Sequence, residues 1–575
     1  MTRMPPNYRC GLKCISTVCV VLLFLSAVLP ATAQNKPLAI PIAAGAYRIA
    51  GTVLNAVTGE PVRGVTVAVL TLEDSSRIGA DQSGNDGCFS IGGVSAGKYQ
   101  LTASKRGFST SFYNEHEQFN SAVVTGAGQD TANLAFRLVP VAVLRGVVTG
   151  DGGDPVAGAQ AMLFAKPGGH APGERIVLTE TAVTDDTGVY EFSNLHAGEY
   201  LLAVKAEPWY AMHRATDGPR RDTASPANAA LDVAFPITYF DSTTEEASAS
   251  PIVLAGGSRM EADISLHAVP ALHLQVDAPR KQDGSIARPE LKQYVFGSEL
   301  ASDTGGVEYR NGGEDVRFGN RANVLHDGEA GVTEFSGVAP GRYEVAQGDP
   351  PRVVEIDAST SQQVEPGAGV PTVAVSGTLQ NANGAPFSGE ATVSLEPADG
   401  AQGLKPMEAG FKRGAFSFAA VPAGSWRLRA ESGGLQSSVL SIAIGGSVHG
   451  GNIVAVADRR LTLVVKLNAG GIRVEGMARK DGKGVAGVMV LLVPKERAEF
   501  PESVRRDESD SDGSFAVRDV APGQYTLLAI EDGWGLDWTR PEVIGRYLPG
   551  GIAVTVTDTH DKVVRIAAPI QVQMR

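Results

Sequence analysis

The chain has 575 residues, which is enough for several domains. It is 43% hydrophobic and contains 68 glycines and 33 prolines, a composition that excludes a disordered chain and suits many short strands joined by tight turns. Its formal net charge of −13 repels nucleic acid and anionic membranes, so neither is expected as a partner.

The first 33 residues have the pattern of a secretory signal peptide. Basic residues stand near the start, an apolar run extends from Ile15 to Leu29, and small residues at 31–33 form a cleavage site. The run is short for a membrane span. We therefore predict a signal peptide over 1–33, a linker over 34–44, no membrane span in the mature chain, and a location that is secreted, periplasmic or associated with the cell envelope.

Residues 45–140 show the unit from which the rest of the chain is built. Residues 47–53 alternate between apolar and polar and predict a strand, and a turn leads to a second strand over 62–69. A further turn at 85–87 precedes a strand that ends in Val94-Ser-Ala-Gly-Lys-Tyr99. In this closing phrase an apolar residue enters a tight turn, a glycine closes the turn, and an aromatic residue opens the next strand.

The closing phrase occurs five times and defines the repeats. The other copies are Leu195-His-Ala-Gly-Glu-Tyr200, Val338-Ala-Pro-Gly-Arg-Tyr343, Val421-Pro-Ala-Gly-Ser-Trp426 and Val520-Ala-Pro-Gly-Gln-Tyr525. Strands of period two between turns predict antiparallel sandwiches around a shared core. An aromatic residue at a fixed repeat position is expected in that core, with its polar atom hydrogen-bonded nearby.

We therefore predict an all-β fold of about five tandem antiparallel β-sandwich domains. The predicted boundaries are 45–140 for the first repeat, 141–268 for the second with an inserted loop over 206–250, 269–356 for a divergent third, a linker over 357–371, 372–468 for the fourth and 469–575 for the fifth.

The ordered set of motifs resembles the carboxypeptidase regulatory-like domain. Those motifs are a Gly-x-Val strand, a Gly-x-Pro-Val-x-Gly turn, an Asp-x-x-Gly-x-Phe turn and the closing phrase, and they match best in the first, second and fifth repeats. The resemblance implies a prealbumin-like, Ig-like sandwich of the carbohydrate-binding-like fold, akin to repeats of bacterial surface adhesins, in a secreted bacterial protein. The family name comes from a module found beside a peptidase and does not imply peptidase activity.

A second aromatic register lies eleven residues after the glycine of the closing phrase, at Phe108, Trp209 and Trp534. An apolar cap over the end of the sandwich is the favoured interpretation. The alternative is a glycan site, because indole faces can stack on sugar rings while acids bond the hydroxyls. The candidate ligand-binding residues are Trp534, Trp538, Asp532, Asp537, Trp209 and Tyr210.

The fifth repeat also contains an acidic turn. Glu508, Asp510 and Asp512, with Asp519 further on, carry the hard oxygen ligands that calcium prefers. The same place in the first two repeats is a short turn at 85–87 and 185–188, so a solvated turn is the favoured interpretation and calcium the alternative. No other cofactor is predicted.

Two motifs of catalytic type have simpler explanations. Ser95 lies in a Gly-x-Ser-x-Gly sequence, but a hydrolase elbow needs a following helix, and here a strand follows. His326 and Glu329 have a zinc-ligand spacing but lie in a loop rich in glycine and aspartate. We predict no catalytic residue and no enzyme activity.

The sequence predicts a secreted, non-catalytic protein for cell-envelope display, adhesion or recognition of protein or glycan surfaces. An envelope or extracellular protein or glycan is the expected partner. The alternatives are a carbohydrate-binding accessory protein to a secreted hydrolase, a peptidase-related enzyme and a purely structural spacer.

Overall fold

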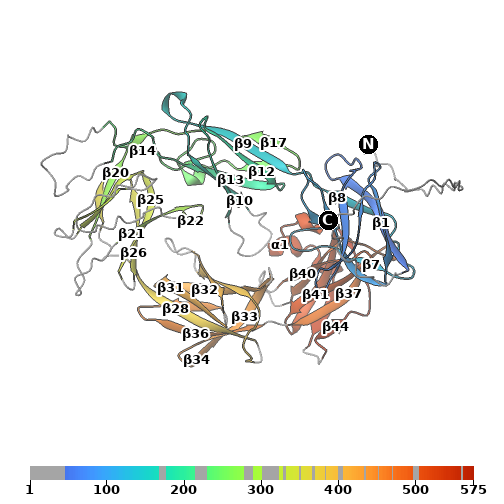
Figure 1. Ribbon diagram of the computed structural model, residues 1–575. Coiled ribbons are helices and arrows are strands. Elements are labelled where there is room, and N and C mark those ends of the chain that lie inside the picture. Colours follow the sequence, from blue (N-terminus) through green and yellow to red (C-terminus); the bar gives the residue numbers. More distant parts are fainter. Residues whose placement is uncertain are drawn as a thin grey trace, which may run out of the picture.

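The protein is built almost entirely of β-strands (Figure 1). The computed structural model describes residues 46–166, 176–213, 230–277, 289–300, 323–327, 332–348, 351–364, 370–381, 384–398, 406–412, 414–432, 435–450, 452–468, 471–495, 504–557 and 561–575. The predicted signal peptide and the linker over 34–44 lie outside these residues. In the part of the chain described, no helix is long and apolar enough to cross a membrane.

Domain 1 packs two sheets, ordered β4-β1-β8 and β3-β2-β5-β6, with β7 also paired to β5. Its strands are β1 (Tyr47–Asn55), β2 (Thr66–Thr71), β3 (Arg77–Gln82), β4 (Cys88–Val94), β5 (Gly97–Ser104), β6 (Ser111–Phe112), β7 (Val123–Thr125) and β8 (Leu134–Leu138).

Domain 2 has the same design, with sheets β12-β9-β17 and β11-β10-β13-β15. Part of the predicted loop over 206–250 belongs to it, because β15 pairs with β13. Its elements are β9 (Ala142–Thr149), η1 (Asp151–Gly153), β10 (Gln160–Lys166), β11 (Val177–Val183), β12 (Val189–Leu195), β13 (Gly198–Lys205), β14 (Val233–Ala234), β15 (Thr238–Tyr239), η2 (Glu246–Ser248), β16 (Ile252–Leu254), β17 (Arg259–Glu261), β18 (Ile264–Ser265) and β19 (Val269–Pro270).

Domain 3 has sheets β23-β24-β20-β27 and β22-β21-β25-β26, and the second of these continues into domain 4 through β28. Its strands are β20 (Leu272–Asp277), β21 (Glu290–Val295), β22 (Ser298–Leu300), β23 (Asn323–Asp327), β24 (Val332–Val338), β25 (Gly341–Gly348), β26 (Pro351–Ala358) and β27 (Gln362–Val364).

The linker predicted over 357–371 is wrong for the residues described within it. β26 ends at Ala358, β27 pairs with β20, and β28 already pairs with β26 through Val370 and Pro371. Gln362 to Val364 are thus edge-strand residues whose backbone completes a sheet of domain 3.

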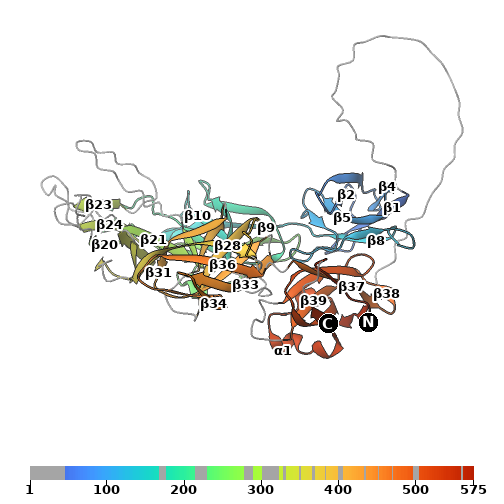
Figure 2. The same cartoon turned by 90° about the horizontal axis from the view of Figure 1, so that it is seen from below.

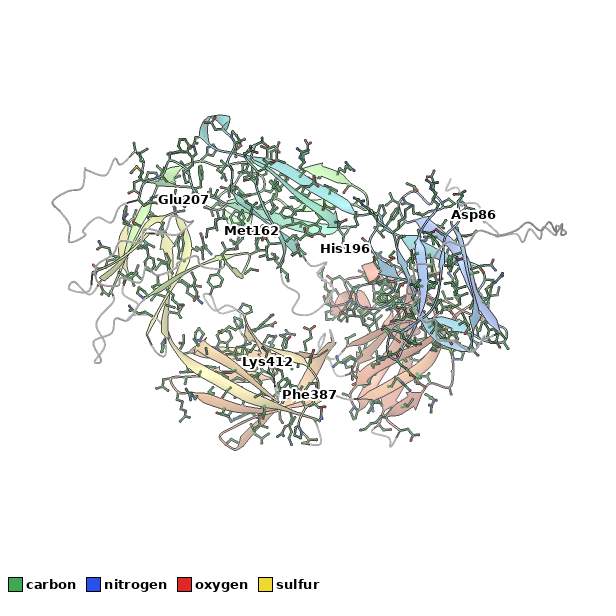
Figure 3. All side chains as sticks on the ribbon, in the orientation of Figure 1. Asp86, Met162, His196, Glu207, Phe387 and Lys412 are labelled. Carbon is green, nitrogen blue, oxygen red and sulfur yellow. The ribbon has the colours of Figure 1, made fainter. Side chains whose placement is uncertain are left out.

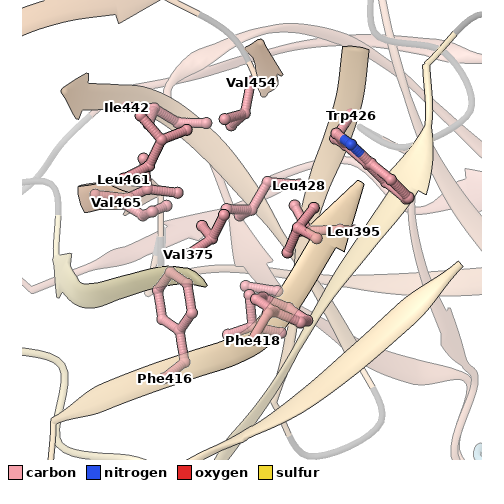
Figure 4. Close-up of a cluster of buried hydrophobic side chains, with 14 of the residues drawn as sticks. Val375, Leu395, Phe416, Phe418, Trp426, Leu428, Ile442, Val454, Leu461 and Val465 are labelled. Atoms are coloured by element: carbon pink, nitrogen blue, oxygen red, sulfur yellow. The ribbon is translucent and has the colours of Figure 1, made fainter. Parts of the chain in front are cut away.

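Domain 4 continues from this shared sheet. Its strands are β28 (Val370–Asn381), β29 (Ala391–Pro397), β30 (Met407–Phe411), β31 (Ala415–Pro422), β32 (Gly424–Ser432), β33 (Leu435–Ile444), β34 (Ser447–Gly450), β35 (Ile453–Val456) and β36 (Leu461–Asn468). Its core contains Phe416, Phe418 and Trp426 among aliphatic side chains (Figure 4).

Domain 5 has sheets built on β37 and on β40-β39-β42-β43. Its elements are β37 (Ile472–Lys480), β38 (Lys483–Gly484), β39 (Met489–Pro494), β40 (Arg505–Glu508), β41 (Ser514–Val520), β42 (Gly523–Glu531), η5 (Gly533–Gly535), α1 (Pro541–Ile544), η6 (Leu548–Gly550), β43 (Ile552–Val556), β44 (Val563–Arg565), β45 (Ile570–Gln571) and β46 (Gln573–Met574).

One pairing pattern recurs in all five domains. The first strand runs antiparallel to the strand that ends in the closing phrase, in the pairs β1/β4, β9/β12, β20/β24, β28/β31 and β37/β41. It also runs parallel to a later strand, in β1/β8, β9/β17, β20/β27, β28/β36 and β37/β44. The predicted all-β tandem sandwiches are confirmed, with the parallel pair as an addition that local alternation cannot reveal.

The closing phrase has a structural role that all five copies share. The aromatic side chain at its last position donates a hydrogen bond to the backbone carbonyl four residues earlier. The pairs are Tyr99 with Ser95, Tyr200 with His196, Tyr343 with Ala339, Trp426 with Pro422, and Tyr525 with Ala521. The ring fills the sandwich while its polar atom fixes the turn, as the sequence predicted.

The five domains follow one another around a closed path, so that domain 1 lies against domain 5 (Figures 1 and 2). Side chains project from every domain around this path (Figure 3). A second contact between domains is apolar, because Val295 and Leu300 of domain 3 join Phe164, Leu201 and neighbouring residues of domain 2 in one buried cluster.

Candidate functional site

The predicted ligand residues lie at equivalent corners of two domains. Trp209 follows β13 in domain 2, and Trp534 lies in η5, which follows β42 in domain 5. Each therefore comes directly after the strand that the closing phrase opens. A side chain at this position is held at the end of a rigid sandwich, which is a common place for binding residues.

At the domain 2 corner, Trp209 is 92% exposed. Tyr210 contacts it edge to face, with ring centroids 5.7 Å apart and planes at 87°. Glu207 and Met212 beside them are also exposed, and Figure 3 labels Glu207 at the end of domain 2 that faces domain 3. The corner therefore presents an open indole face with a carboxylate nearby in the chain.

Behind this corner, two histidines share one carboxylate where domain 2 meets domain 3. Asp232 Oδ1 lies 2.9 Å from His213 Nδ1, and Asp232 Oδ2 lies 2.7 Å from His273 Nε2. Burial opposes ionisation of Asp232, but the hydrogen bonds from both histidines outweigh it and lower its pKa. The carboxylates of Glu207 and Asp232 raise the pKa of His213 against the effect of burial.

At the domain 5 corner, both indoles pack onto the outer face of the β39-β42 sheet. Trp538 is 3% exposed and joins a cluster that includes Met489, Leu491 and Ile530. Trp534 packs at the edge of this cluster and donates its indole N–H to the carbonyl of Gly487 at 3.1 Å. In this conformation, Trp538 lacks the open face that sugar stacking requires.

The two acids predicted beside these indoles have different surroundings. Asp532 is exposed and begins η5 with a left-handed backbone, φ 54°. Asp537 is half-buried and accepts a hydrogen bond from Thr539 at 2.6 Å. The segment that carries all four residues is thus a cover for the sheet.

The β6–β7 loop of domain 1 covers Trp534. The imidazole of His116 stacks on Trp534 with ring centroids 5.1 Å apart and planes at 4°, and Phe119 packs against the same indole at 5.4 Å. Arg506 lies over three rings, 4.4 Å from the centroid of Trp538, 5.3 Å from that of Phe119 and 5.8 Å from that of Trp534. Such stacking of a guanidinium on aromatic faces is a favourable cation–π arrangement.

Arg506 also forms a two-point ion pair with domain 1. Its Nη1 and Nη2 donate to the two carboxylate oxygens of Glu117 at 3.0 and 2.6 Å. The Arg506 side chain is only 7% exposed, so its charge is neutralised by a partner from another domain. The planar fork of arginine suits this combination of stacking and bidentate pairing, which a lysine cannot reproduce.

The acidic turn of domain 5 also faces domain 1. The Glu508 side chain is fully buried, and its Oε1 accepts a hydrogen bond from Ser121 Oγ at 2.7 Å while Oε2 lies 2.9 Å from His116 Nδ1. Asp510 Oδ2 lies 2.6 Å from Lys98 Nζ, and Asp510 Oδ1 accepts the backbone N–H of Ala122 at 2.9 Å. Two of the four predicted calcium ligands therefore bind domain 1.

The other two predicted calcium ligands serve domain 5 itself. Asp512 Oδ1 accepts the backbone N–H of Ser514 at 2.9 Å. Asp519 accepts from Arg505 Nε, at 3.1 Å, through its backbone carbonyl. Among the residues described, no group of three or more His, Cys, Asp and Glu side chains is arranged to hold a metal ion.

The acidic segment is a turn, as its backbone shows, but the prediction that the turn is solvated is wrong, because Glu508 and Ser509 are buried and Asp510 is nearly so against domain 1. Gly513 N–H donates to Asp510 O at 2.8 Å and Asp510 N–H donates to Ser514 O at 2.7 Å. Domain 2 closes its turn in the same way, with Gly188 N–H donating to Asp185 O and Asp185 N–H to Val189 O, both at 3.0 Å. Calcium at this turn remains an untested alternative.

Burial controls the charge of this acidic cluster. It raises the pKa of Glu508, although the hydrogen bonds from His116 and Ser121 act in the opposite direction. It also raises the pKa of Asp510 against the attraction of Lys98, and it raises that of Asp507 to about 6. Asp507 accepts a hydrogen bond from Ala516 within domain 5, and this bond acts against the effect of burial.

Ser95 and His326, which belong to the two motifs of catalytic type, lie among the described residues. Ser95 lies in the tight turn between β4 and β5, where its carbonyl accepts hydrogen bonds from Thr125 and Tyr99. This confirms the turn interpretation of the Gly-x-Ser-x-Gly sequence. His326 lies in the strand β23 and not in a loop as predicted, and Glu329 lies outside the described residues.

The interface residues of domain 1 were not found from the sequence. His116, Glu117, Phe119 and Ser121 lie between short strands and match no motif. For the domain 5 side of the contact, comparison of the repeats does give a signal. The strand before the turn ends at Gln82 in domain 1, at Val183 in domain 2 and at Glu508 in domain 5. Only the third is a carboxylate.

Comparison with known proteins agrees with the repeat motifs. Residues 48–139 and 143–223 match the family model of the carboxypeptidase regulatory-like domain. The predicted resemblance is thus confirmed for the first two domains. No curated protein sequence matches the chain.

Solved structures of low sequence identity are similar to parts of the chain. The TIE protein of Bacillus anthracis is 11% identical, with 73% of this chain and 74% of that one covered and a TM-score of 0.15. The minor pilin GBS52 of Streptococcus agalactiae is 13% identical over 39% of this chain and 97% of its own, with a TM-score of 0.19. A protein of Pseudomonas aeruginosa that has been proposed to bind carbohydrate is 18% identical over 17% of this chain and 89% of its own, with a TM-score of 0.12.

Proposed function

We propose that this protein is a secreted, non-catalytic array of β-sandwich domains that recognises glycan or protein surfaces at the cell envelope or outside the cell. The observation that carries the proposal is the bare indole of Trp209, which is 92% exposed at the end of domain 2. The other three tryptophans lie in apolar clusters or at their edges.

The chemistry of the corner suits a neutral sugar. An indole face binds the apolar face of a pyranose ring, and the perpendicular ring of Tyr210 at 5.7 Å forms one wall beside it. The exposed carboxylate of Glu207 can accept hydrogen bonds from hydroxyl groups. A neutral glycan also avoids the repulsion that the net charge of −13 exerts on anions.

The fold supports the corner as a binding platform. Domain 2 has a complete buried core, and β13, which leads to Trp209, pairs with β10, β15 and β16. A ligand at the corner would therefore meet side chains that are already ordered, which lowers the entropic cost of binding. Tandem domains add avidity when several surfaces meet one envelope.

Retention of the mature chain on immobilised envelope polysaccharide and peptidoglycan tests the proposal. We expect Trp209→Ala to weaken retention by about tenfold or more, because stacking and apolar contact are lost together. Val253→Ala is the matched control, since Val253 is an exposed apolar residue in β16 of the same domain. Equal retention of the wild type and Trp209→Ala on every glycan tested would exclude Trp209 as the binding residue.

A further inference from the structure

We propose that the contact between domains 1 and 5 is a reversible latch that closes the chain on itself and covers Trp534, and that Glu508 is the side chain on which closure depends. The latch consists of residues that contact each other across the two domains. In domain 1 these are Lys98, His116, Glu117, Phe119, Ser121, Ala122 and Val124, and in domain 5 they are Gly487, Arg506, Glu508, Ser509, Asp510, Ser511, Ser514 and Trp534. This inference does not depend on whether Trp209 binds a glycan.

The repeats themselves show that Glu508 serves the contact between domains. The strand before the turn that closes at Gly87, Gly188 or Gly513 ends at an equivalent residue in three domains. This residue is Gln82 in domain 1, Val183 in domain 2 and Glu508 in domain 5. Gln82 is exposed and Val183 is 67% exposed, whereas the side chain of Glu508 is fully buried. A sandwich of this type therefore does not need a buried carboxylate here, and in domain 5 the side chains that bond it come from domain 1.

The partners of Glu508 form a complete set across the contact. Ser121 Oγ, itself fully buried, donates to Oε1, and His116 Nδ1 lies beside Oε2. Gly487 N–H donates to the same Ser121 Oγ at 3.1 Å. Ser121 Oγ also lies 2.9 Å from the carbonyl of Ser509. Removal of the Ser121 hydroxyl therefore leaves Glu508 Oε1 buried without this hydrogen bond, which costs more than the bond itself contributes.

Backbone groups extend the contact beyond the side chains. Ser511 N–H donates to the carbonyl of Ala122 at 2.9 Å, and Val124 N–H donates to Ser511 Oγ at 2.8 Å. Both amide groups donate their hydrogen bonds to the opposite domain. They therefore report directly on whether the latch is closed.

The latch is separable from the cores of both domains. Domain 1 and domain 5 each have a buried cluster of their own, and neither cluster contains residues from the other domain. The contact itself consists of hydrogen bonds, ion pairs and stacked rings, which is the character of contacts between domains that open and close. Closure within one chain is favoured by the high local concentration of two tethered surfaces.

Opening of the latch changes what domain 5 presents. Trp534 occupies the same repeat position as Trp209, but His116 and Phe119 lie against its ring. Separation of the domains would expose this ring and release Arg506 from Glu117. In the closed latch, domain 1 thus covers the aromatic corner of domain 5, whereas the equivalent corner of domain 2 is exposed.

Hydrogen exchange on the full mature chain tests the latch. We expect Glu508→Ala to speed exchange at Ser511 and Val124 by about tenfold or more, given the strength of hydrogen bonds to a buried charge, with no change in the core strands β42 and β5. Ser121→Ala, which alters the other half of the contact, is expected to have the same effect. Val183→Ala, at the equivalent strand end of domain 2, is the matched control and should change neither site.

Two outcomes would overturn the proposal. If exchange at Ser511 and Val124 is unchanged in both variants, closure does not depend on Glu508. If β42 and β5 exchange faster together with the latch amides, the contact is part of one folding unit and is not a reversible latch. Light scattering over a range of protein concentrations completes the test, because a dimer that Glu508→Ala dissolves would show that domain 1 docks on a second copy and not on its own chain.

Discussion

Trp209 and Trp534 occupy one position in two copies of the same repeat, yet their surroundings are opposite. Trp209 is 92% exposed, whereas Trp534 is stacked on His116 and bonded to Gly487. Both follow the strand that the closing phrase opens, so the local sequence places them alike. The difference arises because domain 1 packs on domain 5 and supplies rings to its corner. A repeat register therefore predicts where a side chain stands but not what covers it.

The carboxylates in two of the interdomain contacts differ in the direction of their pKa shifts. Asp232 at the junction of domains 2 and 3 lies between two histidines, and their hydrogen bonds lower its pKa. Glu508 and Asp510 in the latch are more deeply buried, and burial raises their pKa values despite favourable partners. Burial thus opposes ionisation in both contacts, but the hydrogen bonds from the histidines outweigh it at Asp232, whereas the partners of Glu508 and Asp510 do not.

The largest effect is expected from removal of a covered indole. Trp538→Ala should lower the stability of domain 5 by about 3–5 kcal/mol, because it leaves a cavity among residues of the sheet cover. Trp209→Ala should change stability by less than about 0.5 kcal/mol, as is usual for exposed positions. Chemical denaturation of both variants measures the difference, and an equal loss in the two would contradict the contrast between the corners.

Trp538→Phe refines the same comparison. The indole N–H of Trp538 is buried without a hydrogen-bond partner in the described structure, so phenylalanine removes an unsatisfied group while it keeps most of the apolar contact. We expect Trp538→Phe to recover most of the stability that Trp538→Ala loses. Failure to recover it would mean that the indole N–H does form an important bond.

A change of pH should separate the two contacts. Groups with raised pKa, such as Glu508 and Asp510, contribute stability that is present below their ordinary pKa and is lost as pH rises through the raised values. We therefore expect hydrogen exchange at Ser511 to become faster, relative to the intrinsic rate, as pH rises from the ordinary pKa of these two acids through their raised values. The charged groups that face this cluster are His116, Lys98, Asp507, Asp512 and Arg518.

The junction of domains 2 and 3 should respond at both ends of the pH range. Asp232 contributes stability above its ordinary pKa of 3.8, and this contribution is lost as pH falls through the lowered value. His213 contributes stability below its ordinary pKa of 6.5, which is lost as pH rises through the raised value. Exchange at the Met212 amide, which bonds to Leu231, should therefore be slowest between these limits. If the Asp232→Asn variant shows the same minimum in the exchange rate of Met212, groups other than Asp232 cause that minimum.

A moderate effect is expected from Arg506→Lys. Lysine keeps the positive charge but loses the bidentate bond to Glu117 and the planar stacking on three rings. Exchange at Ser511 and Val124 should rise by about tenfold, while Arg518→Lys, on an exposed side chain of the same domain, should leave it unchanged. Equal exchange in both variants would show that charge alone holds the latch.

The smallest effect is expected from calcium. Glu508 and Asp510 are bonded to domain 1, and Asp512 bonds Ser514 within its own turn. We expect the melting temperature of the mature chain in millimolar calcium and in chelator to differ by less than about 1 °C, because only a ligand that binds the folded state stabilises it. A rise of several degrees would instead establish a calcium site at the acidic turn.

The sequence was a good guide wherever the information is local. Alternating apolar residues and the five closing phrases predicted the strands and turns, and the aromatic ring at Tyr525 bonds back to Ala521 as expected. The parallel pairing of β1 with β8 and the strand at 362–364 were not predictable in the same way. A late strand pairs with whichever sheet edge is still unpaired in the folded domain. The sequence of a short segment contains little information about which edge that is.

The candidate site shows the same division. The sequence by itself determined that Trp209, Trp534 and the acidic turn lie at the ends of sandwiches, because strand period and turn chemistry fix those positions within each repeat. Only the tertiary structure decided that Trp209 is open while Trp534 and Glu508 are covered, because their burial depends on His116 and Ser121, almost 400 residues away in the chain. Contacts between separately folded domains leave no periodic signal in either one, and so only the assembled molecule shows them.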